Sequence, residues 1–263
     1  MQRNSWQYII GFAGLICVFC SLLVSTAVVA LKERQSANAL LDKQKKVLWV
    51  AGLIDADAVP DPDEVHRLFE GRVHAHVVSL QTGEEAPESE IDPATYDQQK
   101  ALSDPNASRE APANPAQVKR LPNYATMYQV LDESGRVELL ILPVYGKGLW
   151  STMWGFVALN RDTTTVRGLI FYAHGETPGL GGEIENPLWI AKWPGRKIFD
   201  EQWRPAIRVI KGPAKGAEEA PHDVDGLSGA TITSNGVTFL LRFWLGENGF
   251  GPYLAKFRES EGS

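Results

Sequence analysis

Ser228-Gly229-Ala230-Thr231, followed directly by Ile232-Thr233-Ser234-Asn235-Gly236, places a threonine hydroxyl on a turn of small residues just before an amphipathic helical segment. The first backbone N–H groups of a helix have no partner inside it, and the helix dipole is positive there, so such a position binds phosphate well. Gly229 and Ala230 let the backbone approach a bulky ligand. Ser and Thr are also common helix caps, so an ordinary cap is the competing interpretation.

The stretch Asp225–Thr231 resembles the attachment motif of the FMN-binding domain family, in which the last threonine carries FMN through a phosphoester bond. Two further features extend the resemblance along nearly the whole chain. One is the segment Gly175–Gly182, and the other is a single apolar segment near the N-terminus. In combination they are similar to the anchored, flavin-bearing subunit family of Na+-translocating NADH:quinone reductases, which implies covalent FMN on Thr231.

A free threonine hydroxyl is a poor nucleophile, so the phosphoester needs help to form. The resemblance implies a separate flavin transferase that takes FMN from FAD and recognises the motif. Asp225 and Ser228 would then serve recognition or turn geometry. We expect Thr233 and Ser234 to cap the following helix, which leaves Thr231 free for modification.

The glycine-rich segment Gly175–Gly182 is the second candidate for cofactor binding. It follows an expected strand, and its glycines permit close approach of the backbone to a flat ring. The spacing is neither a Rossmann fingerprint nor a P-loop, and a plain connection is the alternative. By resemblance, the residues that border the isoalloxazine ring are Glu176, Thr177, Gly179 and Leu180.

The segment Tyr145–Ser151 is the third candidate. Trp150 is predicted to flank the flavin, although a core or interface role is the alternative, and for Trp154 that role is favoured. A cation near the pyrimidine edge of the ring would stabilise anionic reduced flavin. Lys147 and Lys211 are the candidates, with a plain solvated lysine as the alternative for each.

The remaining polar residues suggest neither a catalytic set nor a metal site. His74 and His76 share one face of an expected strand, but no third ligand accompanies them. His174 and His222 lie beside the two flavin motifs in the sequence and are candidates for contact with the cofactor. The net charge is −6 without a basic cluster, which argues against a nucleic-acid partner.

The chain has an expected membrane anchor at Tyr8–Leu31, 24 residues without a charge. About 20 apolar residues suffice for a helix to cross a bilayer. Cys17 and Cys20 both lie in this segment, where we interpret them as small packing residues, with a metal site shared with a partner subunit as the alternative. A cleaved signal peptide is the competing interpretation of the segment itself, because Ser25–Ala27 is weakly typical of a cleavage site.

Two arguments give opposite orientations for this anchor. Arg3 precedes the segment, whereas several basic residues follow it within residues 32–46, so the positive-inside rule favours a cytoplasmic domain. The resemblance implies a single-pass protein of the bacterial inner membrane whose large domain is periplasmic. We adopt the second interpretation.

The organisation expected from these features has four parts. Residues 1–7 form a short tail, 8–31 a transmembrane helix, 32–120 a membrane-proximal helical region, and 121–263 the FMN-binding domain. Within the third part, residues 82–117 contain five prolines and eight acidic residues against two basic ones, which indicates a surface excursion or mobile loop.

The periodicity predicts an α+β fold with a twisted, largely antiparallel sheet and flanking helices. The expected helices are 32–53, 61–69, 188–193 and 237–245. The expected strands are 73–80, 124–131, 137–144, 154–159, 166–173 and 206–210, with a hairpin at Glu133–Arg136.

We therefore expect a membrane-anchored electron carrier of a multisubunit respiratory complex, coupled within that complex to Na+ export. Its partners would be the other subunits, the flavin transferase and membrane lipid. Two alternatives stay open: the corresponding flavin-bearing subunit of the related ferredoxin/NAD electron-transport complex, and a non-redox membrane-anchored scaffold with an unmodified threonine.

Overall fold

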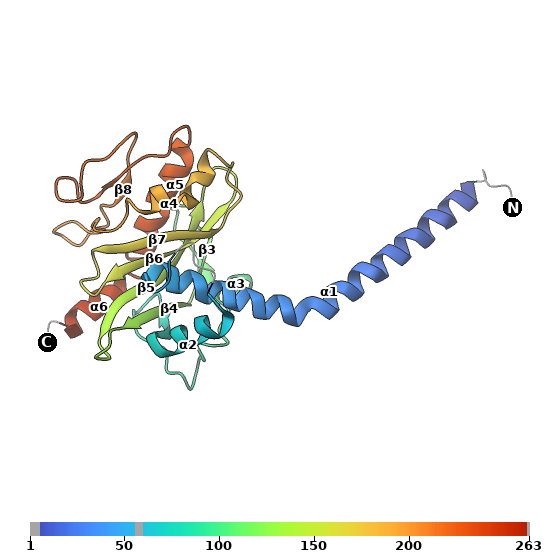
Figure 1. The fold of residues 1–263 in the computed structure, drawn as a ribbon, viewed down its shortest axis with the longest axis horizontal. Helices are drawn as coiled ribbons and strands as arrows, with labels where there is room; N and C mark the ends of the chain where they lie inside the picture. Colours follow the sequence, from blue (N-terminus) through green and yellow to red (C-terminus); the bar gives the residue numbers. More distant parts are fainter. Residues whose placement is uncertain (1–5, 56–59, 262–263) are drawn as a thin grey trace. The chain divides into compact units, whose positions relative to one another are not determined.

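The computed structural model describes residues 6–55 and 60–261 and divides the chain into two units, which meet between Gln44 and Lys45. The helix α1 (Trp6–Ala51) runs through this boundary (Figure 1). Its stretch Trp6–Lys32 has a mean hydropathy of 2.5 and is long and apolar enough to cross a membrane. Most of the expected tail, and Arg3 with it, lies outside the described residues.

The second half of α1 confirms the helix expected from residue 32 onward. The helix ends at Ala51, where Gly52 adopts φ +74° and the N–H of Leu53 donates to the carbonyl of Leu48 at 2.9 Å. A left-handed glycine after the last turn is a common helix stop.

The centre of the larger unit is one antiparallel sheet of five strands in the order β1-β4-β5-β6-β7. The strands are β1 (Val73–Ser79), β4 (Tyr124–Leu131), β5 (Val137–Lys147), β6 (Thr152–Asn160) and β7 (Val166–Ala173). The expected hairpin joins β4 to β5, where Asp132 Oδ1 accepts the N–H groups of Ser134 and Arg136. The predicted fold class is confirmed, and β1 completes the sheet from the 32–120 region.

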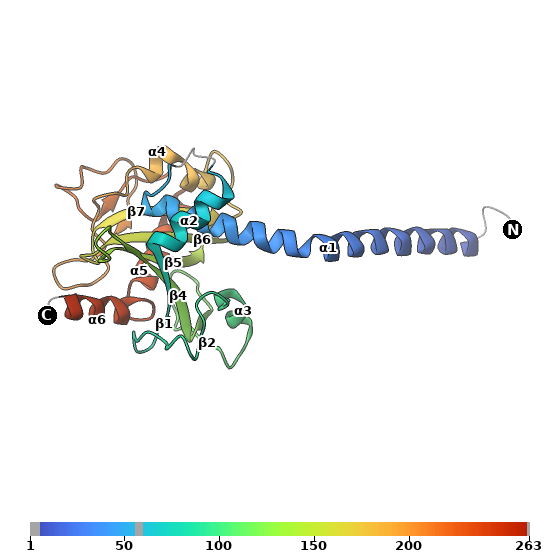
Figure 2. The same ribbon diagram turned by 60° about the horizontal axis from the view of Figure 1, so that its bottom comes forward.

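Both faces of this sheet are covered by helices. On one face, Leu140 and Leu142 pack with α5 (Thr231–Trp244), whose Trp244 indole also donates to the Tyr145 carbonyl at 2.6 Å. On the other, Phe69 of α2 (Pro62–Arg72) meets the Tyr128 ring edge-on. Figure 2 shows α5 and α6 (Gly251–Glu261) on one side of the sheet and α2 on the other.

The acidic segment 82–117 contains more regular structure than a plain loop. It forms α3 (Gln98–Ser103) and β2 (Ser108–Glu110), which pairs with β3 (Arg120–Pro122). The Arg120 guanidinium donates to Ser108 Oγ and its carbonyl, which secures this small sheet. The sequence pattern missed these elements because they are short and held by side-chain contacts.

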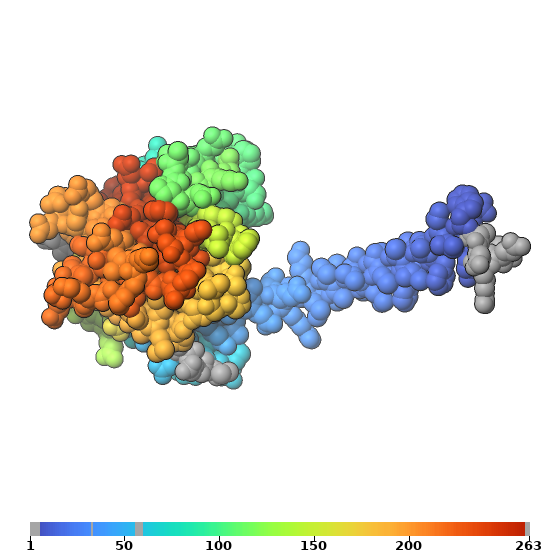
Figure 3. Space-filling view, turned by 90° about the horizontal axis from the view of Figure 1, so that it is seen from above, coloured from blue at the N-terminus to red at the C-terminus, as the bar shows by residue number. Residues whose placement is uncertain are grey.

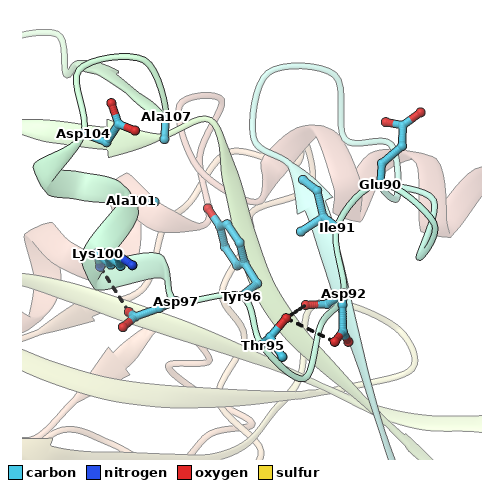
Figure 4. Close-up of a pocket in the computed structure, with 10 residues that line it drawn as sticks. All are labelled: Glu90, Ile91, Asp92, Thr95, Tyr96, Asp97, Lys100, Ala101, Asp104 and Ala107. Carbon is cyan, nitrogen blue, oxygen red and sulfur yellow. Dashed lines mark hydrogen bonds between the residues drawn. The ribbon is translucent and has the colours of Figure 1, made fainter.

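A shallow pocket in this segment gathers several acidic side chains around Tyr96 (Figure 4). The aspartates serve local turns: Asp92 Oδ1 accepts the Ala94 N–H, Asp97 caps α3, and Asp104 Oδ1 accepts the Asn106 N–H. Across the described part of the chain no group of three or more His, Cys, Asp or Glu side chains could hold a metal ion.

The C-terminal part differs from expectation in its details. The elements here are η1 (Gly181–Glu185), α4 (Pro187–Ile190), β8 (Arg208–Val209), β9 (Asp223–Val224), α5 and α6. The expected helix 188–193 ends at Ile190, and the expected strand 206–210 shrinks to β8, which pairs in parallel with β9. α5 begins six residues before the predicted Val237, and α6 was not predicted.

Candidate functional site

Thr231 is the first residue of α5, and its side chain is exposed. The N-cap is Ala230, which has no side chain able to cap. The prediction that Thr233 and Ser234 cap the helix is wrong. Both are buried one turn into it, where Thr233 Oγ1 donates to Glu176 Oε2 at 2.6 Å and Ser234 Oγ accepts the Leu227 N–H at 3.2 Å.

The start of α5 therefore keeps free hydrogen-bond donors beside the Thr231 hydroxyl. Within the described residues, the N–H groups of Thr231, Ile232 and Thr233 and the Thr231 hydroxyl have no protein acceptor. These three N–H groups belong to the first turn, where helix N–H groups have no intrahelical partner. An anion at the start of the helix can therefore accept hydrogen bonds from them.

A pocket of about 490 Å³ opens beside this helix start. Thr231 lines it together with Lys211 and Gly212 from the β8–β9 connection and Ser228 and Gly229 from the motif. The structure thus brings Lys211 into one pocket with Thr231, although twenty residues separate them in the sequence.

The two glycine-rich motifs meet next to this pocket. Gly229 adopts φ +70°, and a Cβ there would lie 2.9 Å from Leu180 Cδ2. The backbone of this position thus favours glycine, and Leu180 packs directly against it. Gly179, at φ +75°, permits the turn in which the Thr177 carbonyl accepts the N–H groups of Leu180 and Gly182.

Glu176 ties three separate segments together with a buried carboxylate. Its oxygens accept the N–H groups of Leu149 and Trp150, at 3.1 and 2.9 Å, and the Thr233 hydroxyl. A longer bond of 3.3 Å comes from the Ser151 N–H. All of these donors belong to protein, so Glu176 fixes the 149–151 loop against the first turn of α5.

The charge of Glu176 is stabilised by these same bonds. Burial raises the pKa of the carboxyl. The hydrogen bonds from Thr233 and from three backbone N–H groups together lower it by more, so the pKa lies below its usual value. A carboxylate that accepts several N–H bonds is the ionised form.

Glycines surround this carboxylate where no side chain fits. A Cβ on Gly181 would lie 2.6 Å from Thr233 Oγ1 and 2.8 Å from Glu176 Oε2, and one on Gly148 would lie 2.6 Å from Glu176 Oε1. Spacings this short are steric overlaps. The glycines of both loops therefore leave room for the Glu176 bonds.

Gly181→Ala tests this packing. The added methyl group must displace the Thr233 hydroxyl or the Glu176 carboxylate, so we expect a loss of about 1–3 kcal/mol in the free energy of unfolding. Urea denaturation of the purified protein measures it. Gly216→Ala is the matched control, since a Cβ there meets nothing within 4 Å; equal stability of the two variants would contradict the close contact.

Four apolar side chains are exposed around the helix start. Trp150 is 65% exposed, Ile232 57%, Leu180 44% and Leu149 42%. Figure 3 shows the segments that carry them, coloured yellow-green, gold and orange-red, close together on one face. An exposed cluster of this kind marks a binding surface for a ligand or protein.

The two candidate lysines differ in their surroundings. The Lys147 ammonium donates to the Trp150 carbonyl at 2.9 Å and so supports the 148–151 loop. Lys211 is exposed and lines the pocket of Thr231. Lys211 is therefore the cation placed to meet a charged ligand there.

Asp225, at the start of the motif, is held by contacts that the sequence did not indicate. Its carboxylate pairs with Lys192 and accepts the Ala214 N–H at 3.0 Å, and its carbonyl accepts the Trp189 indole N–H at 2.8 Å. Asp225 thus shapes the loop that leads to Thr231. This role is visible only in the folded structure, because no local sequence pattern indicates which distant residues contact Asp225.

Of the histidines, His174 contacts the glycine-rich segment, whereas His222 and His76 contact other parts of the chain. His174 Nδ1 accepts the Glu176 N–H at 3.1 Å, and its Nε2 lies 3.1 Å from Glu185 Oε1. His222 contacts the Lys197 carbonyl, and His76 contacts Glu85 at the other end of the sheet order. His174 supports the glycine-rich segment, and His222 is outside the set that lines the Thr231 pocket.

The residues around Thr231 fit the phosphate of FMN. They provide an exposed hydroxyl, three N–H groups without an acceptor among the described residues and a nearby lysine, with apolar side chains beside them for a ring. Such a donor set matches a phosphate group on an aromatic body.

Comparisons with known proteins agree with this geometry. The FMN-binding domain family matches residues 148–246, which include the loop at Trp150, the Glu176 segment and Thr231. The C subunit (NqrC) of the Na(+)-translocating NADH-quinone reductase of Yersinia pestis is 48% identical over 249 residues, 93% of this chain and 90% of that protein. The chain belongs to this NqrC family.

Further NqrC relatives are similar to this chain in sequence and in structure. That of Pseudomonas aeruginosa is 47% identical, and the match covers 95% of each chain. The crystal structure of Shewanella oneidensis NqrC superposes with a TM-score of 0.76 at 32% identity, over 83% of this chain and 97% of that one. The Parabacteroides distasonis protein gives a TM-score of 0.65 at 26% identity, over 85% and 96%. These matches confirm the resemblance and the fold class predicted from the sequence.

Proposed function

We propose that this chain is the electron-carrying NqrC component of a Na+-translocating NADH:quinone reductase, with FMN attached by a phosphoester to Thr231. The observation that carries the proposal is the exposed Thr231 hydroxyl at a helix start whose first N–H groups have no acceptor among the described residues. Bound FMN supplies redox chemistry that protein side chains do not.

The surrounding residues have distinct roles in this proposal. Gly229 and Ala230 keep the approach to Thr231 open, Ser228 shares its pocket, and Thr233 anchors the helix turn through Glu176. Lys211 balances negative charge in the pocket. Trp150 and Leu180 provide the apolar border of the ring, with Thr177 and Gly179 forming the turn that presents Leu180.

Attachment needs an enzyme, because the Thr231 hydroxyl has no base beside it. The structure gives it no hydrogen-bond partner among the described residues, and an unassisted hydroxyl is a poor nucleophile. A flavin transferase that supplies FMN from FAD would use the exposed motif, and Ser228 and Thr231 are both accessible to it.

The same proposal covers the place of the chain in the cell. The segment Trp6–Lys32 anchors it in the inner membrane, and the larger unit, residues 45–263, which contains β1 and the residues proposed to bind FMN, lies on the periplasmic side. Coupling to Na+ belongs to the assembly with other subunits. The names and near-full-length coverage of the relatives favour this assignment over the flavin-bearing counterpart in the ferredoxin/NAD complex.

The proposal is tested on the chain produced in its own membranes with its flavin transferase. We expect yellow fluorescence that stays with the polypeptide on a denaturing gel, and peptide mapping that places the added mass on Thr231. A bare polypeptide from fully assembled complex would contradict the covalent carrier and favour the scaffold alternative. Sodium-dependent quinone reduction by the assembled complex distinguishes NqrC from the ferredoxin/NAD counterpart.

A further inference from the structure

Another hollow of the larger unit lies at the other end of α5 and has no part in the flavin site. Its volume is about 830 Å³. Four aromatic side chains line it, Phe199, Trp203, Phe239 and Phe243, together with Arg204, Arg242 and Arg258. Phe239 follows Thr231 by eight residues on one helix, a separation of about 12 Å along its axis.

Trp203 occupies a backbone position that normally favours glycine. Its φ is +58°, at the end of a tight turn in which its N–H donates to the Asp200 carbonyl at 3.0 Å and the Asp200 N–H in turn donates to the Arg204 carbonyl. A bulky residue in this left-handed region is costly, and such residues cluster at turns and functional sites. The indole is nevertheless 48% exposed, so burial in the fold does not account for it.

Arg258 lies over the face of this exposed indole. Its guanidinium carbon is 3.8 Å from the centre of the Trp203 ring and 5.6 Å from that of Phe199. Arginine stacked on an aromatic ring keeps its in-plane N–H groups available for an anion. The stack therefore presents an apolar surface and donors at the same place.

Two of the three guanidinium groups in this hollow hydrogen-bond to neutral acceptors. Arg204 pairs with Asp200, whereas Arg242 donates to the Ala206 and Ile207 carbonyls and Arg258 to Thr163 Oγ1. Burial lowers the pKa of Arg242, and it lowers that of Arg258 against the opposing charge of Glu259. The exposed Glu247 is the one acid among the described lining residues. Half-buried guanidinium groups of this kind favour a partner that brings a carboxylate.

We propose that this hollow, the aromatic–arginine pocket, docks an acidic peptide segment of another polypeptide in the assembly, with a carboxylate on Arg242 and Arg258 and an apolar side chain against Trp203 and Phe239. Trp and Arg are the residues that most often dominate such interfaces. The proposal rests on the assembly with other subunits given under Proposed function, but not on the attachment of FMN.

The test uses the full chain in the assembled, membrane-embedded complex. A photo-crosslinking phenylalanine analogue replaces Phe239, which is 37% exposed, and in a control chain it replaces Glu133 on the β4–β5 turn. Light should join position 239, but not position 133, to a segment of another polypeptide that contains Asp or Glu. Cross-links to lipid, to a segment without an acid, or no more product than at position 133 would overturn the proposal.

Two variants separate docking from folding. Trp203→Gly removes the indole and relieves the positive φ, so the melting temperature should stay near that of the parent while the cross-linked product falls about tenfold. Arg258→Gln should lower it similarly. An unchanged product in both variants contradicts the proposal.

The same samples provide the remaining controls. Arg258→Glu, combined with replacement of the mapped acid by lysine, should restore the cross-linked product. Covalent FMN, measured by intact mass in every sample, should be unaffected by these changes. In the chain without these substitutions, absence of the position-239 cross-link with FMN present contradicts the docking proposal alone, and absence of FMN with the cross-link present contradicts the attachment proposal alone.

Discussion

Thr231→Ala should yield a folded, membrane-anchored chain with no covalent FMN. The substitution deletes an exposed hydroxyl that makes no hydrogen bond to the described residues, and alanine is a good helix former at the first position of α5. We therefore expect the free energy of unfolding to change by about 0.5 kcal/mol or less. Intact-mass spectrometry should find only the bare polypeptide, because the acceptor oxygen is gone.

Two companion variants make this result specific. Thr231→Ser keeps a hydroxyl at the same place and should retain covalent FMN, with lower occupancy. Thr233→Ala keeps Thr231 but removes the bond to Glu176, so it should lower stability while the flavin stays on Thr231. A Thr231→Ala chain that still carries flavin through denaturation would show that another residue is the attachment site.

The sheet was predictable because its signals are local. The strands β4 to β7 are apolar runs separated by turn residues, and Asp132 and Gly135 mark the hairpin between β4 and β5. The short pair β8 and β9 was missed as a pair, since two residues give no periodicity and their parallel pairing joins distant segments.

The sequence pattern predicts a start of α5 that is too late, and the reason is physical. Ile232 and Thr233 are β-branched and weak helix formers, so the sequence pattern becomes helical only from Val237. In the structure, burial of Thr233 and its bond to Glu176 hold this first turn in helical form. Tertiary contacts here outweigh propensity.

The candidate site likewise contains residues that a local motif predicts and residues whose role depends on tertiary contacts. Thr231 and the glycines beside it carry a local motif, and their exposure followed from it. The role of Glu176 depends on Thr233, 57 residues away, and on backbone N–H groups of the loop at Trp150. Sequence reasoning named Glu176 as a ring contact, and nothing in its neighbours indicates the carboxylate bonds that the fold provides.

Glu176→Gln should cause the second large effect, a loss of stability that depends on pH. The amide keeps one acceptor oxygen but loses the charge, and in either orientation its NH2 group faces at least one backbone N–H that cannot accept from it. Hydrogen bonds to a charged group are worth about 1.5–3 kcal/mol each, so at pH 7 we expect the variant to lose at least about 2 kcal/mol in the free energy of unfolding.

The pH dependence has a definite sign. The pKa of Glu176 is below its ordinary value of 4.5 in the folded chain, so the ionised carboxylate stabilises the fold above pH 4.5. That stabilisation is lost as the pH falls through the folded pKa. The difference between wild type and Glu176→Gln should therefore be constant near neutrality and shrink below pH 4.5.

Urea denaturation at pH 7 and at pH 4, with Glu201→Gln as the exposed control, measures this difference. A double-mutant cycle with Thr233→Val isolates the bond between the two side chains, and its coupling energy should exceed about 1 kcal/mol at pH 7. A coupling near zero would mean that Glu176 stabilises the loop alone. A positive coupling ties the Trp150 loop to the helix turn of Thr231, so the residues proposed to border the flavin and the residue proposed to carry it would be held in place by one carboxylate.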